Sequence, residues 1–256
     1  AHTPVGINPG GAAGENDLRQ PSLVCDSHDR LHLVCQSVVK ADIPTGGTEG
    51  MQYIVYTTKL QNESSFTSYP STTTLSGTID SRWQVVSKPY SDLANDENSE
   101  TAFGNDATEF NSHPKVCLRG DNIPFVFWLG SCPNVTASEV SDRKLSAVYV
   151  NNGSNPTGVN DASGHFSFNQ DNCQAVINGQ TIHGNYAVKY YAAIIDSRNR
   201  AVVVAIKNAG GPPVEISTFD CNKPLVDQYV AGTAPKLGNN KILFQQKVSG
   251  SLLSEA

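Results

Sequence analysis

The sequence predicts an all-β protein built from a repeated unit of antiparallel strands. Three segments of the 256-residue chain share one pattern, in which an apolar run, a polar turn and a second apolar run follow one another: Pro21–Cys35, Pro114–Trp128 and Ala192–Ile206. Each is followed by a loop and a third run of β-branched and aromatic residues, at 51–56, 145–150 and 214–219. Runs of this composition between turn residues are typical of β-strands.

The turns of these segments also match. Asp26–Arg30 in the first segment corresponds to Asp196–Arg200 in the third, and we place residues 118–122 of the second in the same position. Such a recurrence indicates a supersecondary unit that buries its apolar face by stacking on its neighbours. We interpret 80–89 and 165–169 as the first strands of the second and third units. A fourth, shorter copy spans 234–246, where Gly238 to Asn240 offers the tight turn that a hairpin needs.

Four short antiparallel strands per repeat predict a β-propeller-like array of four-stranded blades, because radial repetition protects strand edges. A β-sandwich is the alternative. Residues 1–18 lack periodicity and are predicted to form a flexible N-terminal arm, and 19–256 a single domain. Residues 249–256 leave the last blade short of strands, so either the arm or a neighbouring molecule is expected to complete it by strand addition.

The pattern of residues 21–34, followed by the strand at 53–56, resembles the blades of sialidase-like β-propellers, and the likeness extends from Arg19 to Gln246. The resemblance implies the fold but not one activity. Arg19-Gln20-Pro21 resembles the Arg-x-Pro motif that opens the first blade of sialidases, where the Arg belongs to a trio that grips the substrate carboxylate. This implies that Arg19 is a ligand-binding residue.

The rest of a sialidase site is missing from the pattern. The later arginines fall mostly in hairpin turns, and Tyr190 and Tyr191 have no carboxylate that a motif places beside them. Glycosidases need two carboxylates facing one cleft, whereas here the acidic residues crowd into one loop, as Asp92, Asp96, Glu97, Glu100, Asp106 and Glu109. We therefore predict no catalytic residues. That loop is interpreted as a solvated acidic insertion, with a Ca²⁺ site as the alternative.

No other cofactor or metal is predicted, because the histidines share no ligand spacing. His32 alternates with Leu31 and Leu33, which places it on the solvent-facing or inter-blade face of its strand. The net charge of −6 and the scattered basic residues argue against nucleic acid or an anionic membrane as partners. No run approaches the ~20 apolar residues of a membrane span. The start at Ala1 lacks a leader pattern, so we expect any secretion signal to have been removed or not to be included in this sequence.

Six cysteines without a Cys-x-x-Cys pair predict disulfides in an oxidising compartment. The favoured pair is Cys117 with Cys132, followed by Cys25 with Cys35 and Cys173 with Cys221; buried free thiols are the alternative. Three glycosylation sequons begin at Asn62, Asn134 and Asn152, all in predicted loops. Cysteines and sequons together predict a secreted protein.

Arg119-Gly120-Asp121 matches the integrin-recognition tripeptide at the tip of a predicted hairpin. Cell adhesion is one interpretation, and ordinary turn chemistry is the other.

Three function classes follow. The favoured one is a secreted, non-catalytic module that recognises glycans or glycoproteins through amide- and tyrosine-rich loops. The second is a propeller-type glycoside hydrolase or lyase. The third is a structural extracellular glycoprotein that assembles through its arm or an incomplete edge blade.

Overall fold

The computed structural model is all-β, with antiparallel pairing in every sheet. It describes residues 16–39, 51–60, 63–64, 72–73, 78–79, 83–87, 111–130, 147–154, 166–169, 172–178, 188–207, 214–225, 227–228, 236–237 and 242–248. Among these residues no helix is long and apolar enough to span a bilayer.

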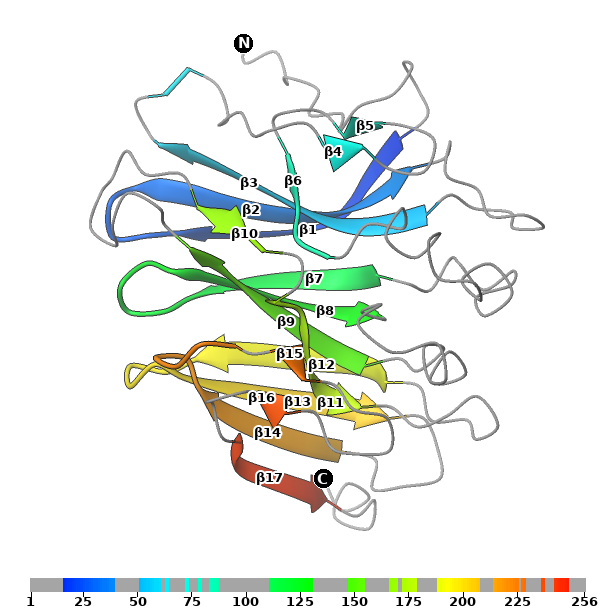
Figure 1. Cartoon of the computed structure of the whole chain (residues 1–256), viewed down its shortest axis with the longest axis vertical. Coiled ribbons are helices and arrows are strands. Elements are labelled where there is room, and N and C mark those ends of the chain that lie inside the picture. Colours follow the sequence, from blue (N-terminus) through cyan, green and yellow to red (C-terminus); the bar gives the residue numbers. More distant parts are fainter. Residues whose placement is uncertain are drawn as a thin grey trace, which may run out of the picture.

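Three sheets form the body of the molecule, one for each repeat (Figure 1). The first has the order β1-β2-β3-β6, with bounds Asn16–Cys25, Arg30–Val39, Met51–Leu60 and Gln84–Val85. The second has the order β10-β9-β8-β7, with bounds Ser167–Phe168, Ala147–Ser154, Pro124–Gly130 and Asn111–Leu118, and β11 (Gln174–Asn178) also pairs with β9. The third has the order β12-β13-β14-β17, with bounds Val188–Ile195, Arg200–Lys207, Val214–Asp220 and Ile242–Val248.

Two short two-stranded pieces complete the list. They pair β4 (Thr72–Thr73) with β5 (Thr78–Ile79), and β15 (Asp227–Gln228) with β16 (Lys236–Leu237).

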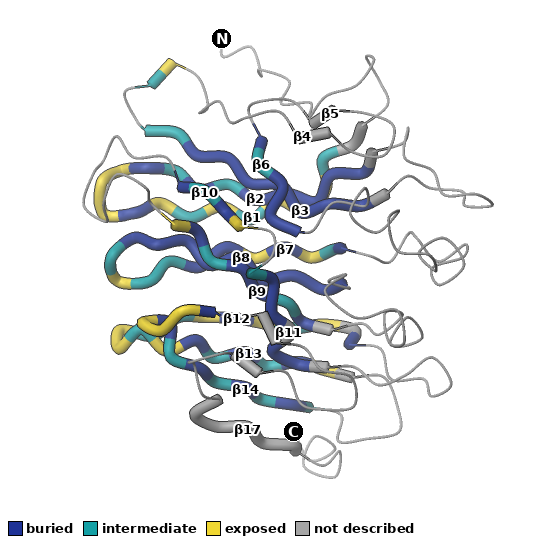
Figure 2. The backbone as a smooth tube through the Cα atoms, viewed as in Figure 1, coloured by how far each residue is buried: buried dark blue, intermediate teal, exposed yellow. Residues whose placement is uncertain are grey.

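The second sheet lies between the other two (Figure 1). Its strand β7 contacts β1, β2 and β3 on one side and β12 on the other. Apolar side chains from all three sheets form one core cluster, which includes Val34, Phe127 and Phe219. Because the middle sheet is covered on both faces, every residue of β8 is buried (Figure 2). Burial of apolar area between sheets is therefore the main force that holds the repeats together.

The hairpin turns confirm that the first and third repeats are equivalent. In each, the first turn residue donates its N–H to the carbonyl of the last over 2.9 Å, in Asp26–Arg30, Arg119–Ile123 and Asp196–Arg200. The fourth residue of each turn has a positive φ: 58° at Asp29, 66° at Asn122 and 57° at Asn199. Asn and Asp tolerate this left-handed conformation better than other non-glycine residues. The second turn starts at Arg119, one residue later than the sequence alignment predicts.

Two predicted segments belong to different units than expected. Within 80–89 the structure has β6, which pairs with β3, and within 165–169 it has β10, which pairs with β9. They are fourth strands of the first and second sheets rather than first strands of the next. The reason is proximity along the chain, because each segment follows the third strand of its own unit and can return beside it.

The predicted fourth copy is also wrong. β17 pairs with β14, and β16 pairs with β15, so residues 234–246 do not form a hairpin of their own. β17 instead gives the third sheet its fourth strand. The predicted shortage of strands at the end of the chain therefore disappears for this sheet. At the other end, β1 begins at Asn16, so the predicted arm reaches into a strand at residues 16–18.

Gly153 in β9 lies beneath the fourth strand of its sheet, opposite Phe168. A Cβ added there would lie 2.9 Å from Pro124 Cγ and 3.3 Å from Phe168 Cζ. We expect Gly153→Ala to lower the free energy of unfolding by about 1–2 kcal/mol, because overpacking outweighs the conformational entropy that alanine saves. Urea unfolding measures this. The control is Ser154→Ala at the exposed neighbouring position, and an equal loss in both variants would contradict the steric explanation.

Candidate functional site

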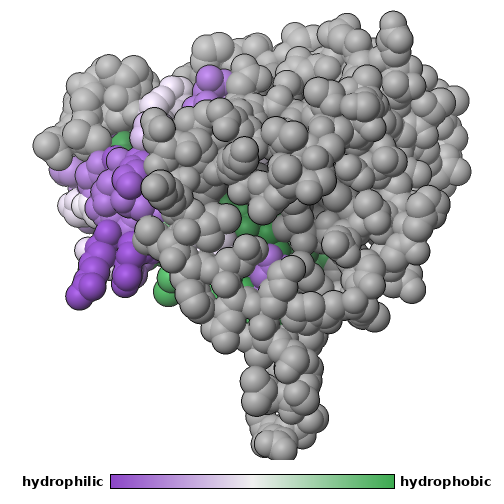
Figure 3. Space-filling model, turned by 60° about the horizontal axis from the view of Figure 1, so that its bottom comes forward, coloured by the Kyte–Doolittle hydropathy of each residue, from purple (hydrophilic) through white to green (hydrophobic). Residues whose placement is uncertain are grey.

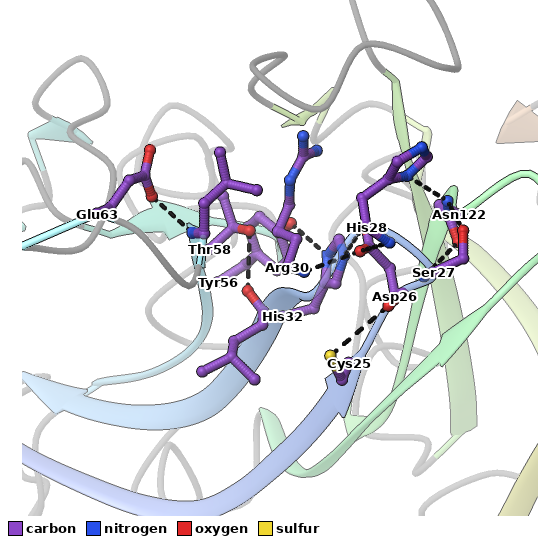
Figure 4. A network of polar contacts seen from close by, with 12 residues as sticks. Cys25, Asp26, Ser27, His28, Arg30, His32, Tyr56, Thr58, Glu63 and Asn122 are labelled. Carbon is purple, nitrogen blue, oxygen red and sulfur yellow. Dashed lines mark hydrogen bonds and ion pairs between the residues drawn. The ribbon is translucent and has the colours of Figure 1, made fainter.

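The most developed polar cluster lies at the turn end of the first sheet, and it starts from Asp26 (Figure 4). One carboxylate oxygen of Asp26, Oδ1, accepts the backbone N–H groups of His28 at 2.8 Å and Arg30 at 2.9 Å. The other oxygen, Oδ2, lies 3.3 Å from Nε2 of His32. The acid therefore closes its own turn and also holds a buried imidazole.

His32 connects this turn to β3. Its Nδ1 lies 2.8 Å from the hydroxyl oxygen of Tyr56. Because the carboxylate of Asp26 can only accept, Nε2 carries the proton, and the Tyr56 hydroxyl donates to Nδ1. His32 and Tyr56 are both 0% exposed. The row Asp26–His32–Tyr56 is thus a fully formed hydrogen-bonded relay that is sealed from solvent.

Aromatic side chains of the second sheet cover this relay. The ring of Phe166 lies 5.3 Å from that of His32, and the ring of Phe168 lies 4.9 Å from that of Tyr56 in an edge-on arrangement. The guanidinium of Arg30 sits 4.9 Å above the Phe166 ring. The cluster therefore spans the boundary between two sheets, with polar groups supplied by the first and the apolar cover by the second.

Burial and hydrogen bonding set the charges in the cluster. Burial alone would raise the pKa of Asp26, but the hydrogen bonds from His32 and from the N–H groups of Arg30 and His28 outweigh it and lower the pKa to about 2. Burial lowers the pKa of His32; the nearby Asp26 opposes this, and Arg30 adds to it. Near neutral pH the pair is a carboxylate beside a neutral imidazole.

An acid, an imidazole and a phenol in a row could in principle activate the phenol as a nucleophile or base. Here the Tyr56 hydroxyl points inward to His32 and has no exposed surface, so a substrate cannot reach it. The third repeat helps to interpret the acid. Asp196 Oδ1 accepts the N–H groups of Arg198 and Arg200, both at 2.9 Å, as Asp26 does with its own turn. Closing the turn is therefore the role that the two acids share.

A ladder of amide side chains links the three turns across the sheets. Asn122 Oδ1 accepts the N–H of Ser27 in the first turn at 3.2 Å. Asn199 Oδ1 accepts the N–H of Gly120 in the second turn at 2.8 Å. Ser27 and Gly120 are the second residues of their turns, so the two links are equivalent. Each left-handed Asn thus joins its turn to the preceding one.

We expect Asn199→Ala to lower the free energy of unfolding by about 2 kcal/mol, half from the strained left-handed backbone and half from the lost link. Asn199→Gly keeps the backbone conformation and should lose only about 1 kcal/mol. Thermal or urea unfolding of both variants separates the two contributions. A glycine variant as stable as the wild type would show that the inter-turn hydrogen bond contributes nothing.

The Arg119-Gly120-Asp121 tripeptide is closed on itself. The guanidinium of Arg119 makes two contacts to the Asp121 carboxylate, at 2.6 Å and 2.5 Å, and a third to the carbonyl of Cys221 at 2.6 Å. The Asp121 hydrogen bond leads the causes that raise the pKa of Arg119. An adhesion motif has to offer its cation and its anion to a receptor, whereas here they neutralise each other. The geometry therefore favours the turn interpretation over cell adhesion.

The three comparisons with known proteins give no family. Neither a family model nor a curated protein matches the chain. Among solved structures, a Trypanosoma rangeli sialidase in complex with sialic acid is similar, with 10% identity and a TM-score of 0.40 over 88% of this chain and 31% of that one. A glycosyl hydrolase from Bacteroides ovatus is similar at 10% identity and a TM-score of 0.38, over 92% of this chain and 59% of that one.

A family 117 glycoside hydrolase produced by Zobellia galactanivorans gives 10% identity and a TM-score of 0.26, over 93% and 71%. The chain thus spans about a third of the length of the sialidase. Since all three TM-scores lie below 0.5, these likenesses carry neither an activity nor a blade count to this chain.

Arg19 is exposed on β1, beside a bulge in its pairing with β2. The bulge places Gln20 at a φ of 53°, and the second repeat has the same feature at His113, also with a φ of 53°. Pro21 and Pro114 follow these residues. The Gln20 side chain accepts the N–H of His113 at 2.5 Å. The Gln20-Pro21 part of the motif is therefore a structural feature of two repeats, while ligand binding by Arg19 stays a prediction.

The hydroxyl of Tyr191 is also engaged in hydrogen bonds within the protein. Its hydroxyl lies 2.6 Å and 2.8 Å from the carbonyl oxygens of His113 and Phe127, so it links the third sheet to the second. Burial raises its pKa well above the ordinary value. Such a phenol is held protonated and serves as a hydrogen-bond donor between sheets.

Four described cysteines, Cys25, Cys35, Cys117 and Cys221, are free thiols. The predicted pairs Cys25–Cys35 and Cys173–Cys221 are therefore not formed, and the Cys173 thiol instead donates to the carbonyl of Val86 at 3.6 Å. Burial raises the pKa values of Cys35 and Cys221 to about 12, which keeps them protonated and unreactive. Strand register explains the first miss, because Cys25 lies opposite Leu31. Cys132 lies outside the described residues, but because the Cys117 thiol is free, the favoured pair Cys117–Cys132 is not formed either.

Asn152 lies within β9, opposite Phe125, and not in the loop that its sequon predicts. Its side chain is half-buried. The other sequon asparagines, Asn62 and Asn134, lie outside the described residues. So does the whole acidic loop from Asp92 to Glu109 with its alternative Ca²⁺ site. Within the ranges that the structure describes, no three His, Cys, Asp or Glu side chains converge as metal ligands.

The pattern of residues missed Tyr56, and of the two faces that it left open for His32, the structure selects the inter-sheet one. Arg30, His32 and Val34 alternate on one strand face, a signal that places the imidazole beside two interface residues. The sequence gives no sign of whether a second sheet covers that face. The pattern identified Asp26 as a turn residue. Its second role, the hydrogen bond with His32, depends on a side chain six positions further along the chain.

Proposed function

We propose that this chain is a secreted, non-catalytic recognition module whose blade-like sheets present loops to glycans or glycoproteins. The observation that carries the non-catalytic part is the shared role of Asp26 and Asp196, each of which binds two N–H groups of its own turn. Among the described residues, the Asp26–His32–Tyr56 relay has side chains that could act in catalysis. It starts from the acid that closes the turn, and Phe166 and Phe168 cover it. These polar networks therefore favour a structural role over a catalytic one.

Three further features support the blade array and the binding role. Each sheet is an antiparallel meander with a fourth strand added at its edge, as the blades of a propeller are. Equivalent turns are linked side by side through Asn122 and Asn199. The loops between strands are rich in Asn, Ser, Thr and Tyr, side chains suited to hydrogen bonding and stacking with sugars.

The experiment measures binding and turnover on the same ligands. The purified chain is applied to a glycan array, and the glycans that bind are then offered as substrates, together with aryl glycosides and sialosides. We expect saturable binding without product, and weaker binding of acidic glycans by Arg19→Ala. Turnover that is lost in Tyr56→Phe would show that the relay is an active site and would overturn the proposal. Binding to no glycan would overturn the ligand class.

The proposal of secretion rests mainly on the sequons. The disulfides that also predicted an oxidising compartment are not formed by the described cysteines that are free thiols. Expression through a eukaryotic secretory pathway should give a mass that falls on glycosidase treatment. We expect glycan on Asn62 and Asn134 and little on Asn152, because Asn152 is half-buried in a paired strand. A mass that glycosidase leaves unchanged would contradict secretion as a glycoprotein.

A further inference from the structure

One face of the third sheet is apolar and exposed. Tyr190 is 62% exposed, Ile194 58% and Ile206 46%. Tyr190 lies directly opposite Ile206 in the register of β12 and β13, and Ile194 lies opposite Val202, so they share one face. Figure 3, which turns the bottom of the molecule forward, shows hydrophobic residues beside a hydrophilic cluster on this side. Exposed apolar patches of this kind mark interaction sites.

The same positions are interfaces in the first two sheets. Counting four residues on from the end of each turn gives Val34, Phe127 and Val204. Val34 and Phe127 are 0% exposed, whereas Val204 is only half-buried. Counting two residues back from the start of each turn gives Val24 and Cys117 inside the stack, and the exposed Ile194. The exposed apolar face of the third sheet is therefore equivalent to the face that the first sheet packs on the second and that the second packs on the third.

The boundaries between the first and second sheets and between the second and third sheets show which residues pack against such a face. At the first, the Val116 N–H donates to Ser22 Oγ at 3.2 Å. At the second, the Cys117 thiol donates to the Ala193 carbonyl at 3.4 Å. Val116 and Ala193 are equivalent residues, three before their turns. Their counterpart in the first sheet is Leu23, which is 59% exposed.

The ladder of turns is open at the same two ends. Within the described part of the chain, the N–H of Ser197, equivalent to those of Ser27 and Gly120, meets no acceptor. The carboxylate of Asp29, which stands where Asn122 and Asn199 stand, receives no donor. Both turn tips are exposed in Figure 2. The free acceptor is an anion, and the free donor lies next to the exposed cation of Arg198.

We propose that a second copy of this chain docks head to tail on the apolar face of the third sheet. The end of one copy that carries Leu23 and Asp29 packs on the end of the other that carries Ile194 and Ser197, in the geometry of the internal boundaries. The Asp29 carboxylate then accepts the Ser197 N–H beside Arg198. Such a contact is heterologous, so it closes into a ring or continues as a filament.

This interface uses sheet faces, and it differs from strand addition at an edge. It rests on the repeat arrangement of the proposed function but not on any ligand. Glycan binding is therefore recorded for each variant below, so that a lost ligand and a lost interface can be told apart.

The test is sedimentation velocity over a range of concentrations. We expect the wild-type chain to associate, and Ile194→Asp and Leu23→Asp each to shift the association constant at least 100-fold towards monomer. Ser154→Asp introduces the same charge at an exposed position of the middle sheet and should leave association unchanged. Circular dichroism and thermal unfolding confirm that the variants fold.

Mixing decides the orientation. Ile194→Asp retains an intact Leu23 end, and Leu23→Asp retains an intact Ile194 end, so an equimolar mixture should form a one-to-one complex that neither forms alone. If Leu23→Asp alone still dimerises, the apolar faces meet each other and the head-to-tail proposal is wrong. A wild-type chain that stays monomeric at the highest concentration reached would overturn the interface altogether.

Discussion

Asp26→Ala is expected to lower the free energy of unfolding by about 3–4 kcal/mol, whereas Asp196→Ala should lower it by much less. Both acids accept two backbone N–H groups of their own turns. Asp26 also accepts from His32, which is 0% exposed and would be left with an unpaired N–H. Asp196 instead binds Arg200, whose exposed guanidinium can turn to water. The two variants are therefore matched for the turn and differ in the buried partner.

Asp26→Asn refines this comparison. An asparagine keeps an oxygen for the two turn N–H groups, but its amide nitrogen faces His32 Nε2, which forces the imidazole into its other tautomer. We expect a loss of about 1–2 kcal/mol, between the two alanine variants. Chemical denaturation with a common slope is the measurement. Equal losses for Asp26→Ala and Asp196→Ala would mean that the contact with His32 adds nothing to stability.

The repeat was predictable because its signals are local. A turn that needs an acid at its first position and a left-handed residue at its fourth leaves the same trace in Asp26–Arg30 and Asp196–Arg200. The alternation of the flanking strands then gives the parts of β1, β2 and β12 next to the turns and nearly all of β13, but β1 begins at Asn16, β2 ends at Val39 and β12 begins at Val188, each outside the predicted segments. The conformation of such a turn is determined by a few adjacent residues, so it can be predicted from the sequence.

Partners distant in sequence were not predictable. β17 pairs with β14 although a turn signal at Gly238 to Asn240 favours a local hairpin, because the open edge of the third sheet offers a longer partner. The cysteines were misassigned for a related reason. A pairing rule counts cysteines, whereas the buried thiols of Cys35 and Cys221 are both free.

The polar cluster was missed because alternation has a different meaning in a stack of sheets. In a sheet with one wet face, a polar residue between two leucines points to water. In the first sheet both faces are covered over most of β3, and polar residues such as Gln52, Thr57 and Thr58 are buried with the apolar ones. His32 therefore lies on the inter-sheet face, where its hydrogen bonds to Asp26 and Tyr56 satisfy it.

The same cluster should make the stability of the protein depend on pH, through His32. Its pKa in the folded state lies below the ordinary value of 6.5, because burial disfavours the imidazolium. Below about pH 6.5 the unfolded chain therefore takes up a proton that the folded chain resists, and acid favours unfolding. We expect the free energy of unfolding to fall as the pH drops from 7.5 to 5.5, with a slope that approaches about 1.4 kcal/mol per pH unit for this one group.

His32→Gln removes this group, so the difference between the two stability curves isolates it from the other histidines. The variant should be less stable by about 2–3 kcal/mol at pH 7.5, because the amide cannot satisfy both Asp26 and Tyr56, and the gap should narrow as the pH falls to 5.5. A second acid loss belongs to Asp26. Since its folded pKa of about 2 lies below the ordinary 3.8, its contribution is present above about pH 4 and is lost between pH 4 and 2. A gap that stays constant from pH 7.5 to 5.5 would mean that His32 does not titrate differently in the folded and unfolded chains.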